Sequence, residues 1–304
     1  MTNSDAKSAS TGLLFGISAY LIWGFFPIYF RSIDLVPPLQ VVAHRIVWAA
    51  LFLAVLTTFR RGWGDIRAAV TSRGSLLLLL TTALLIATNW LVFIIAVGHG
   101  EILQSSLGYF ITPFVSVILG MVVLQERLRL LQSVALLLAL AGVLLITVQQ
   151  SGIPWAALTL ALTFGSYGLL RKVVGVDALA GLAVETFILF PVALAYLVFV
   201  KLKGTGCFLY TGLLNDILLV SAGLLTSIPL LLFAAAARRL RMATIGFLQY
   251  ITPTMHFLIA VVIYREPFKL SSLVSFGFIW LGLLLYSLDA LRGVRQRPSS
   301  AYTD

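Results

Sequence analysis

Tyr109-Phe110-Ile111-Thr112-Pro113 recurs 140 residues later as Gln249-Tyr250-Ile251-Thr252-Pro253. The match runs on without gaps, since a glutamate follows each proline by thirteen residues, as Glu126 and Glu266. A repeat of this kind decides the fold before any local pattern does. One copy follows the other after five apolar segments, an odd number. We therefore expect the second copy to enter a membrane upside down, an arrangement typical of secondary transporters.

Composition supports a chain that lies in a membrane. The 304 residues are 60% hydrophobic and 11% charged, with a mean hydropathy of +1.04, whereas soluble domains carry about 25% charged residues. A single cysteine, Cys207, excludes a disulfide within the chain and a cysteine-rich metal site. The net charge of +10 would suggest nucleic acid in a soluble protein. Here we assign it to membrane orientation.

Ten apolar stretches are long enough to cross about 30 Å of hydrocarbon as helices. They cover residues 12–30, 39–59, 76–97, 102–124, 130–148, 153–170, 179–200, 217–237, 242–264 and 270–289. The predicted fold is an all-α integral membrane protein with ten transmembrane helices in two inverted five-helix repeats. We expect the first repeat in residues 1–150, the second in 151–292 and a cytoplasmic tail in 293–304.

Basic residues predict the orientation. With the N-terminus inside, fifteen of the 21 Lys and Arg fall on the cytoplasmic side, five fall outside, and Arg45 lies within a span. The inner set is Lys7, Arg60, Arg61, Arg67, Arg73, Arg127, Arg129, Arg171, Lys172, Arg238, Arg239, Arg241, Arg292, Arg295 and Arg297. The outer set is Arg31, Lys201, Lys203, Arg265 and Lys269. Such a bias predicts that both termini lie in the cytoplasm.

Pro113 and Pro253 fall near the middle of their spans. A proline inside a helix lacks the N–H and frees the carbonyl four residues earlier, here that of Tyr109 or Gln249. Interrupted helices at equivalent positions of two repeats are the best sequence indication of a transport site. The alternative is a pair of kinks that serve packing.

Two ionisable residues lie inside spans, and such groups indicate function by default. Arg45 and Glu185 each lie about six residues, or about 9 Å, from a membrane face. The topology places Arg45 in the outer third and Glu185 in the inner third, about 12 Å apart along the normal of a core about 30 Å thick. We therefore expect no direct ion pair, and a vestibule around each that opens to its own side. The alternative is a snorkelling Arg45, with Glu185 bonded to a neighbouring helix.

Other polar and aromatic residues could complete a central pocket. Gln249, Thr252 and His256 share one helix face by their spacing. Asn89 and Trp90, together with Tyr20 and Trp23, would supply the polar and aromatic lining that suits a small organic ligand. His44 and His256 could carry a proton. Ordinary packing is the alternative for the aromatic residues, a hydrogen-bonded structural role for His44, and interfacial solvation for Glu126 and Glu266.

Several strings together resemble the EamA-type permeases of the drug/metabolite transporter superfamily. These strings are Tyr20-Leu21-Ile22-Trp23-Gly24, His44-Arg45-x-x-Trp48, Asn89-Trp90-Leu91, Ser106-Leu107-Gly108-Tyr109-Phe110, Glu126-Arg127, Tyr167-Gly168-Leu169, Glu185-Thr186 and Arg239-Leu240-Arg241…Gln249-Tyr250-Ile251. The family often has Asn-Pro where this chain has Thr112-Pro113. The resemblance implies ten helices, an inner-membrane location and export or exchange of small metabolites or drug-like compounds.

The candidate residues divide into two sets. The substrate-binding candidates are Trp23, Arg45, Asn89, Trp90, Tyr109, Gln249 and Tyr250. The gating or coupling candidates are His44, Pro113, Glu185, Pro253 and His256. No cofactor is expected, because the sequence has no Walker or other glycine-rich phosphate loop, no metal-ligand spacing and no Gly-x-Ser-x-Gly nucleophile motif.

The sequence favours a secondary transporter that works by alternating access. Its expected partners are a small organic substrate and membrane lipid, with a coupling proton and a homodimer left open. An amino-acid-like zwitterion fits one basic and one acidic group, Arg45 and Glu185. A membrane sensor or scaffold, or an intramembrane enzyme, is the alternative.

Overall fold

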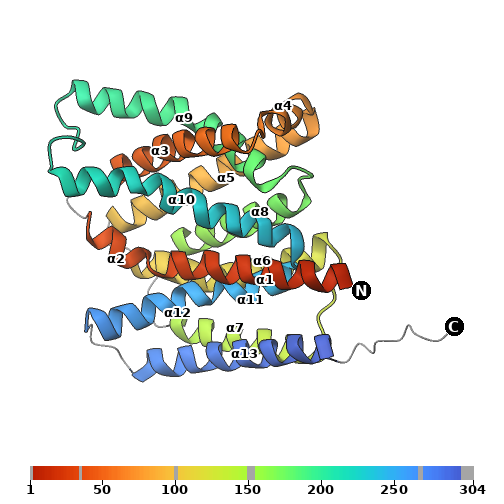
Figure 1. Ribbon diagram of the computed structural model, residues 1–304. Coiled ribbons are helices and arrows are strands. Elements are labelled where there is room, and N and C mark those ends of the chain that lie inside the picture. Colours follow the sequence, from red (N-terminus) through yellow and green to blue (C-terminus); the bar gives the residue numbers. More distant parts are fainter. Residues whose placement is uncertain (1–2, 34–35, 99–101, 149–154, 266–269, 296–304) are drawn as a thin grey trace.

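The computed structural model describes residues 3–33, 36–98, 102–148, 155–265 and 270–295. The described residues form helices and connecting turns (Figure 1). In chain order the helices are α1 (Asn3–Gly24), α2 (Phe26–Arg31), α3 (Pro38–Phe59), α4 (Trp63–Thr71), α5 (Arg73–Gly98), α6 (Ile102–Val123), α7 (Leu130–Val148), α8 (Trp155–Val173), α9 (Ala178–Leu202), α10 (Leu213–Arg239), α11 (Met242–Gln249), α12 (Ile251–Leu258), the π-helix η1 (Ile259–Ile263) and α13 (Leu270–Arg295).

Helix length and hydropathy confirm an all-helical membrane fold. Six stretches are long and apolar enough to cross a bilayer: Lys7–Arg31, Pro38–Phe59, Arg73–Phe93, Ala178–Leu202, Leu213–Arg239 and Met242–Ile263. Three shorter apolar helices lie at Gly108–Val123, Leu130–Leu145 and Leu273–Asp289. Because α8 falls in neither group, the number of ten spans stays a prediction. Large apolar side chains such as Leu77, Val122 and Val192 are exposed on the bundle surface, as lipid contact requires.

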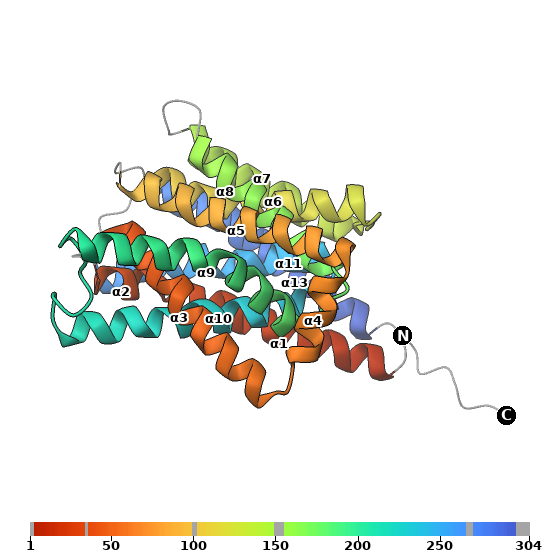
Figure 2. The same cartoon turned by 90° about the horizontal axis from the view of Figure 1, so that it is seen from above.

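The short helix α4 was not predicted as an element of its own. It joins α3 to α5 and contacts α9 (Figure 2). Ile66 and Ala69 are buried on one side of α4, whereas Arg67 is exposed. Its nine residues are amphipathic and too few to cross a bilayer. The predicted inner loop therefore contains a helix that packs on the bundle.

Helix partners recur in matched pairs. α3 packs on α9, α6 on α11, and α7 along α13. If α1, α3, α5, α6 and α7 correspond in order to α8, α9, α10, α11–α12 and α13, the other main contacts match as well. The contact of α6 with α8 then corresponds to that of α12 with α1. Likewise the contact of α5 with α8 corresponds to that of α10 with α1. The contact of α3 with α10 corresponds to that of α9 with α5.

Two glycines mark the close contact between α7 and α13. A Cβ atom on Gly142 of α7 would stand 2.5 Å from the carbonyl oxygen of Ser275 in α13. A Cβ atom on Gly282 of α13 would stand 2.6 Å from the carbonyl oxygen of Ala135 in α7. Each residue of the second contact is 140 positions from its counterpart in the first. The sequence offset thus reappears as matched packing.

The two chain ends lie at the same end of the bundle, because α1 begins where α13 ends (Figures 1 and 2). This placement agrees with termini on one side of the membrane. The domain limits at 1–150, 151–292 and 293–304 stay predictions. The join at 149–154, Glu266 and the final residues 296–304 lie outside the described residues.

The predicted interruption of both proline-containing helices is found in only one. α6 continues from Ile102 to Val123 through Pro113, so the prediction is wrong there. The second copy divides at Tyr250 into α11 and α12, three residues before Pro253. Because Pro253 has no N–H, the carbonyl of Gln249 is released at this division. The helix that contains the second copy then ends in η1.

Candidate functional site

Arg45 of α3 lies in the interior, with 8% of its surface exposed. Its Nε atom donates a hydrogen bond to Oγ1 of Thr226 in α10, at 2.9 Å. The guanidinium carbon lies 4.8 Å from the ring centre of Trp90 and 5.9 Å from that of Phe30. Aromatic faces attract a cation at these distances. One arginine thus joins α2, α3, α5 and α10.

Aromatic rings extend from Arg45 across the bundle. Phe30 lies 6.3 Å from Phe93, and Phe93 lies 6.2 Å from Tyr109, between ring centres. Tyr109 meets His256 edge to face at 6.1 Å. The Nε2 atom of His256 lies 3.2 Å from the backbone carbonyl oxygen of Trp23. The hydroxyl groups of Tyr29 and Tyr109 also lie within electrostatic range of Arg45.

The structure therefore brings together Trp23, Arg45, Trp90, Tyr109 and His256, five of the residues singled out in the sequence. They come from α1, α3, α5, α6 and α12. We call this set, with Phe30 and Phe93, the arginine–aromatic group. Phe30, Phe93 and Thr226 were missed, because nothing in the chain indicates which apolar ring or hydroxyl will face a distant arginine.

Arg45 pairs with no carboxylate among the described residues. The ion pairs there are Arg129–Asp289, Arg171–Glu185, Arg238–Asp177 and Arg241–Glu126. The expectation that Arg45 and Glu185 form no ion pair agrees with this set. A buried guanidinium without an anion is costly, so a residue of this kind indicates a functional role.

Glu185 of α9 lies in a closed polar cluster, with 1% of its surface exposed. One carboxylate oxygen accepts a hydrogen bond from Thr82 at 2.7 Å, and the other accepts one from Tyr167 at 3.2 Å. Arg171 Nη1 lies 3.4 Å from the first oxygen, and Arg171 itself is fully buried. Arg171 Nη2 also donates to the Ala178 carbonyl. These contacts match the alternative in which Glu185 bonds to neighbouring helices, since no open vestibule surrounds it here.

Arg171 is the clearest correction to the sequence analysis. It was counted among the basic residues of the cytoplasmic segments, and no partner was predicted for it. The structure buries it completely. The spacing of Tyr167 and Arg171, one helical turn apart, could have indicated a shared polar face.

A small internal cavity lies beside Glu185 and two of the residues that contact Arg45, although Arg45 itself does not line it. Trp90 and Thr226, which contact Arg45, line one part of it, and Glu185 lines another. The remaining lining residues are Ile46, Ala49, Ile86, Leu182, Thr186, Leu189, Ser227 and Leu230. The cavity lies among α3, α5, α9 and α10.

Asn89 and Tyr250 make packing contacts apart from the arginine–aromatic group. The Asn89 amide donates to the Leu160 carbonyl at 3.0 Å and to Thr163 Oγ1 at 2.9 Å, which ties α5 to α8. Tyr250 is buried in an apolar cluster, where it meets Phe114 edge to face. The contact of Tyr250 corresponds to the packing alternative given for the aromatic residues.

Gln249 remains partly unsatisfied. Its Oε1 atom accepts a hydrogen bond from Ser116 of α6 at 3.1 Å. Its buried Nε2 atom has no hydrogen-bond partner among the described residues. Nearby, Thr252 Oγ1 donates to the Tyr20 carbonyl at 2.9 Å. The division of the helix at Tyr250 thus lies beside this buried amide group, which is close to the Tyr20 hydroxyl.

Pro113 and Gln249 are on helices that cross closely. A Cβ atom on Gly246 of α11 would stand 2.8 Å from the Pro113 carbonyl oxygen. The Thr112 hydroxyl donates back to the Gly108 carbonyl within α6. Pro113 therefore lies at a helix contact without breaking its helix.

His44 faces a different part of the molecule. Trp48 Nε1 donates to His44 Nδ1 at 3.3 Å, and the His44 ring lies 5.1 Å from that of Phe208. A pocket lined by Gln40, His44, Trp48, Lys201, Cys207 and Tyr210, among others, opens here between α3 and the end of α9. His44 is thus separate from the arginine–aromatic group.

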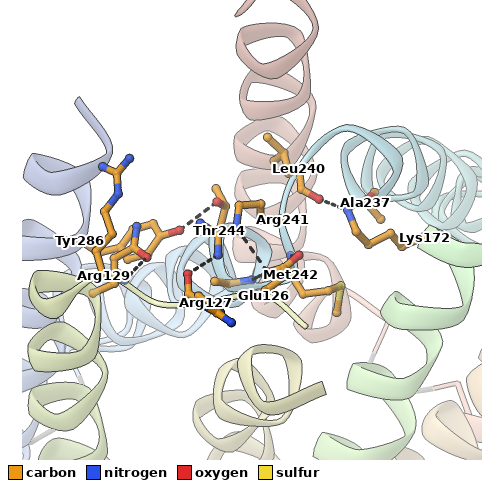
Figure 3. A network of polar contacts seen from close by, with 12 residues as sticks. Glu126, Arg127, Arg129, Lys172, Ala237, Leu240, Arg241, Met242, Thr244 and Tyr286 are labelled. Atoms are coloured by element: carbon orange, nitrogen blue, oxygen red, sulfur yellow. Dashed lines mark hydrogen bonds and ion pairs between the residues drawn. The ribbon is translucent and has the colours of Figure 1, made fainter. Parts of the chain in front are cut away.

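A polar network covers the end of the bundle where α1 begins. The Glu126 carboxylate accepts hydrogen bonds from the backbone N–H groups of Met242 at 2.9 Å and Ala243 at 3.2 Å, at the start of α11. Arg241 Nε lies 3.7 Å from the same carboxylate, and Lys172 Nζ donates to the Leu240 carbonyl (Figure 3). Glu126 therefore does more than meet solvent, since it caps α11.

Comparisons with known proteins agree with this architecture. Residues 10–148 match the EamA-like transporter family. The chain is 44% identical to an uncharacterized transporter of Pseudomonas aeruginosa, over 94% of this chain and 96% of that protein. It is 41% identical to protein RarD of Escherichia coli, over 94% of this chain and 97% of the relative. One crystal structure superposes with a TM-score of 0.73 at 19% identity, covering 95% of this chain and all of the other. That likeness shows the fold alone.

Proposed function

Because the chain belongs to the RarD-like EamA transporters of the drug/metabolite transporter superfamily, we propose that it is a secondary transporter working by alternating access. It moves a small organic molecule across the bacterial inner membrane. The observation that carries this proposal is the arginine–aromatic group, in which a buried cation lies among rings and pairs with no carboxylate of the described residues. Such a set of contacts binds a small molecule better than it stabilises a bundle.

The matched helix partners support the alternating mechanism. Two similar halves that pack through equivalent contacts can exchange their arrangements at low cost, because each state reuses the same kinds of contact. The reciprocal contacts of Gly142 and Gly282 lie at the α7–α13 pair, away from Arg45. We assign this pair as a fixed support, and the helices around Arg45 as the moving part.

The Glu126 network supports a closed inner side in this conformation. We assign the end where α1 begins to the cytoplasm, from the bias of fifteen basic residues against five. Arg241 and Lys172 then join the α8 end to the α6–α7 and α10–α11 connections on that side. Opening toward the cytoplasm must break these contacts.

The test is a comparison of secreted metabolites. A bacterial host would express the wild type, Arg45→Gln or Arg31→Gln at equal membrane abundance, and the medium would be compared by mass spectrometry. We expect at least one compound enriched by the wild type and by Arg31→Gln, which alters only an exposed arginine, and not by Arg45→Gln. The same compound should show counterflow in vesicles that contain the purified protein.

Two results would contradict the proposal. No compound enriched by the wild type, together with no counterflow of any candidate, would favour the alternative of a membrane sensor or scaffold. Equal enrichment by wild type and Arg45→Gln would keep a transporter and remove the arginine–aromatic group as its site.

A further inference from the structure

The charge of Arg45 is the feature that identifies a ligand class. Arg45 donates from Nε alone, to Thr226, and both terminal nitrogens are without a hydrogen bond to the described residues. A guanidinium with two terminal N–H groups in one plane matches a carboxylate, which accepts two parallel hydrogen bonds. The residue is more than nine-tenths buried, so its charge is only weakly screened by water.

No described carboxylate is placed to serve Arg45. Glu185 is bound by Thr82, Tyr167 and Arg171. Glu126, Asp177 and Asp289 pair with Arg241, Arg238 and Arg129, and Asp216 accepts from the backbone of Leu209. Since Glu185 already has its own cation, the acidic group on which the expectation of a zwitterion depended is in use.

The surroundings of Arg45 suit the rest of such a ligand. Trp90 and Phe30 face the guanidinium, and Phe93 and Tyr109 continue the apolar wall. The hydroxyl groups of Tyr29 and Tyr109 lie in electrostatic range of Arg45. An anion on Arg45 would offset a charge that no described carboxylate compensates, whereas a cation would be repelled.

We propose that this site takes an organic monoanion, with its carboxylate on Arg45 and its apolar body against the rings of Trp90, Phe30 and Phe93. This inference rests on the proposed function and narrows it. Neutral and cationic compounds of the same shape should bind much more weakly, because neither supplies the missing negative charge.

Matched acid and amide probes test the proposal on the purified full-length protein in detergent. The probes are phenylacetate and phenylacetamide, hexanoate and hexanamide, phenylalanine as a zwitterion and phenethylamine as a cation. A ligand that binds the folded state raises the Tm by mass action. We expect phenylacetate or hexanoate to raise the Tm, with the matched amide at least tenfold weaker in apparent Kd. Phenylalanine should be no tighter than phenylacetate, and phenethylamine should have no effect.

Variants assign the effect to one side chain. Arg45→Gln should abolish the shift by acids, and Arg45→Lys, which keeps the charge and loses the fork, should weaken binding severalfold. Arg31→Gln is the matched control, since Arg31 also faces a ring, that of Tyr264 at 4.3 Å, but is exposed. If Arg45→Gln does not fold, the acid–amide comparison and Arg45→Lys still decide the result.

The inference is overturned if amides bind as well as acids, if acids still bind Arg45→Gln, or if no acid of the panel shifts the Tm. Its failure is distinct from failure of the proposed function. Flux of a neutral compound that is unchanged in Arg45→Gln would retain a transporter and remove the anion site. Binding of acids that requires Arg45, without flux of any bound acid in vesicles, would retain the anion site and remove transport.

Discussion

Arg171 and Glu185 hold opposite charges in the interior, and each depends on the other. Removing one member of a buried pair leaves an unpaired charge, at a cost of about 3–5 kcal/mol. We therefore expect Glu185→Leu and Arg171→Met each to lower the Tm strongly. The double variant Arg171→Met, Glu185→Leu should be more stable than either, because no charge is left without a partner. Thermal unfolding of the four proteins, followed by tryptophan fluorescence, measures the cycle.

The stability of the Glu185 variants also decides how a loss of transport in them is interpreted. Thr82→Val is the control, since it removes one hydrogen bond to Glu185 and keeps both charges. It should cost only about 1–3 kcal/mol. A double variant as unstable as the sum of the two single ones would show that the two charges do not support each other.

The residues of the site could be predicted only in part. Arg45 and Glu185 stand out in sequence because a charge within an apolar span is rare. Their partners do not, since Thr226 is 181 positions from Arg45 and only the packing of α3 on α10 brings them together. Asn89 is also a polar residue within an apolar span, yet its amide hydrogen-bonds α5 to α8. The type of residue shows that a partner is needed, and the fold determines which partner it is.

The α7–α13 contact is the element whose geometry makes the sharpest stability prediction. Gly142→Ala and Gly282→Ala would place a methyl carbon 2.5 Å and 2.6 Å, respectively, from the facing carbonyl oxygen. We expect each to destabilise by about 1–3 kcal/mol, as overpacking does. Gly277→Ala on α13 has nothing within 4 Å and should be neutral or stabilising by up to about 1 kcal/mol, because alanine favours helix. Thermal unfolding of the three variants gives the comparison.

The same variants also test whether α7 and α13 are equivalent elements of the two repeats. If α7 and α13 are equivalent elements, Gly142→Ala and Gly282→Ala should cost similar amounts. A large cost for one and none for the other would contradict their equivalence. A cost for Gly277→Ala equal to either would show that the loss comes from helix propensity or backbone freedom instead.

At the level of elements, the repeat correctly predicted that both copies are helical. It did not predict that only one of the two helices is interrupted. Both copies have Ile-Thr-Pro, yet α6 continues through Pro113 and the other copy divides at Tyr250. The residue four before each proline is Tyr109 in one copy and Gln249 in the other, and the surroundings differ as well. Proline removes the same hydrogen bond in both copies, and tertiary contacts decide whether the helix yields.

For the whole molecule, the repeat and the apolar stretches were sufficient for the fold class, because a bilayer accepts little besides helices. The arrangement of those helices around Arg45 was not, since it depends on contacts between segments far apart in the chain. Orientation remains the global property that the chain's charge predicts most directly. It has a convenient reporter, because the single cysteine lies on the predicted outer side.

Cys207 lies in the connection between α9 and α10, which the basic residues place outside the cell. We expect a membrane-impermeant maleimide to label it in intact cells, without lysis. Partial burial raises the pKa of the Cys207 thiol, so less thiolate is present at neutral pH than for a free cysteine, and the thiolate is the form that reacts. Labelling should therefore be slow at pH 7 and should accelerate up to about tenfold for each pH unit toward pH 9.

The matched control is Cys207→Ser with Ser72→Cys, which moves the thiol to the exposed turn between α4 and α5, on the predicted inner side. That thiol should react only after lysis, and the reverse pattern would invert the whole topology.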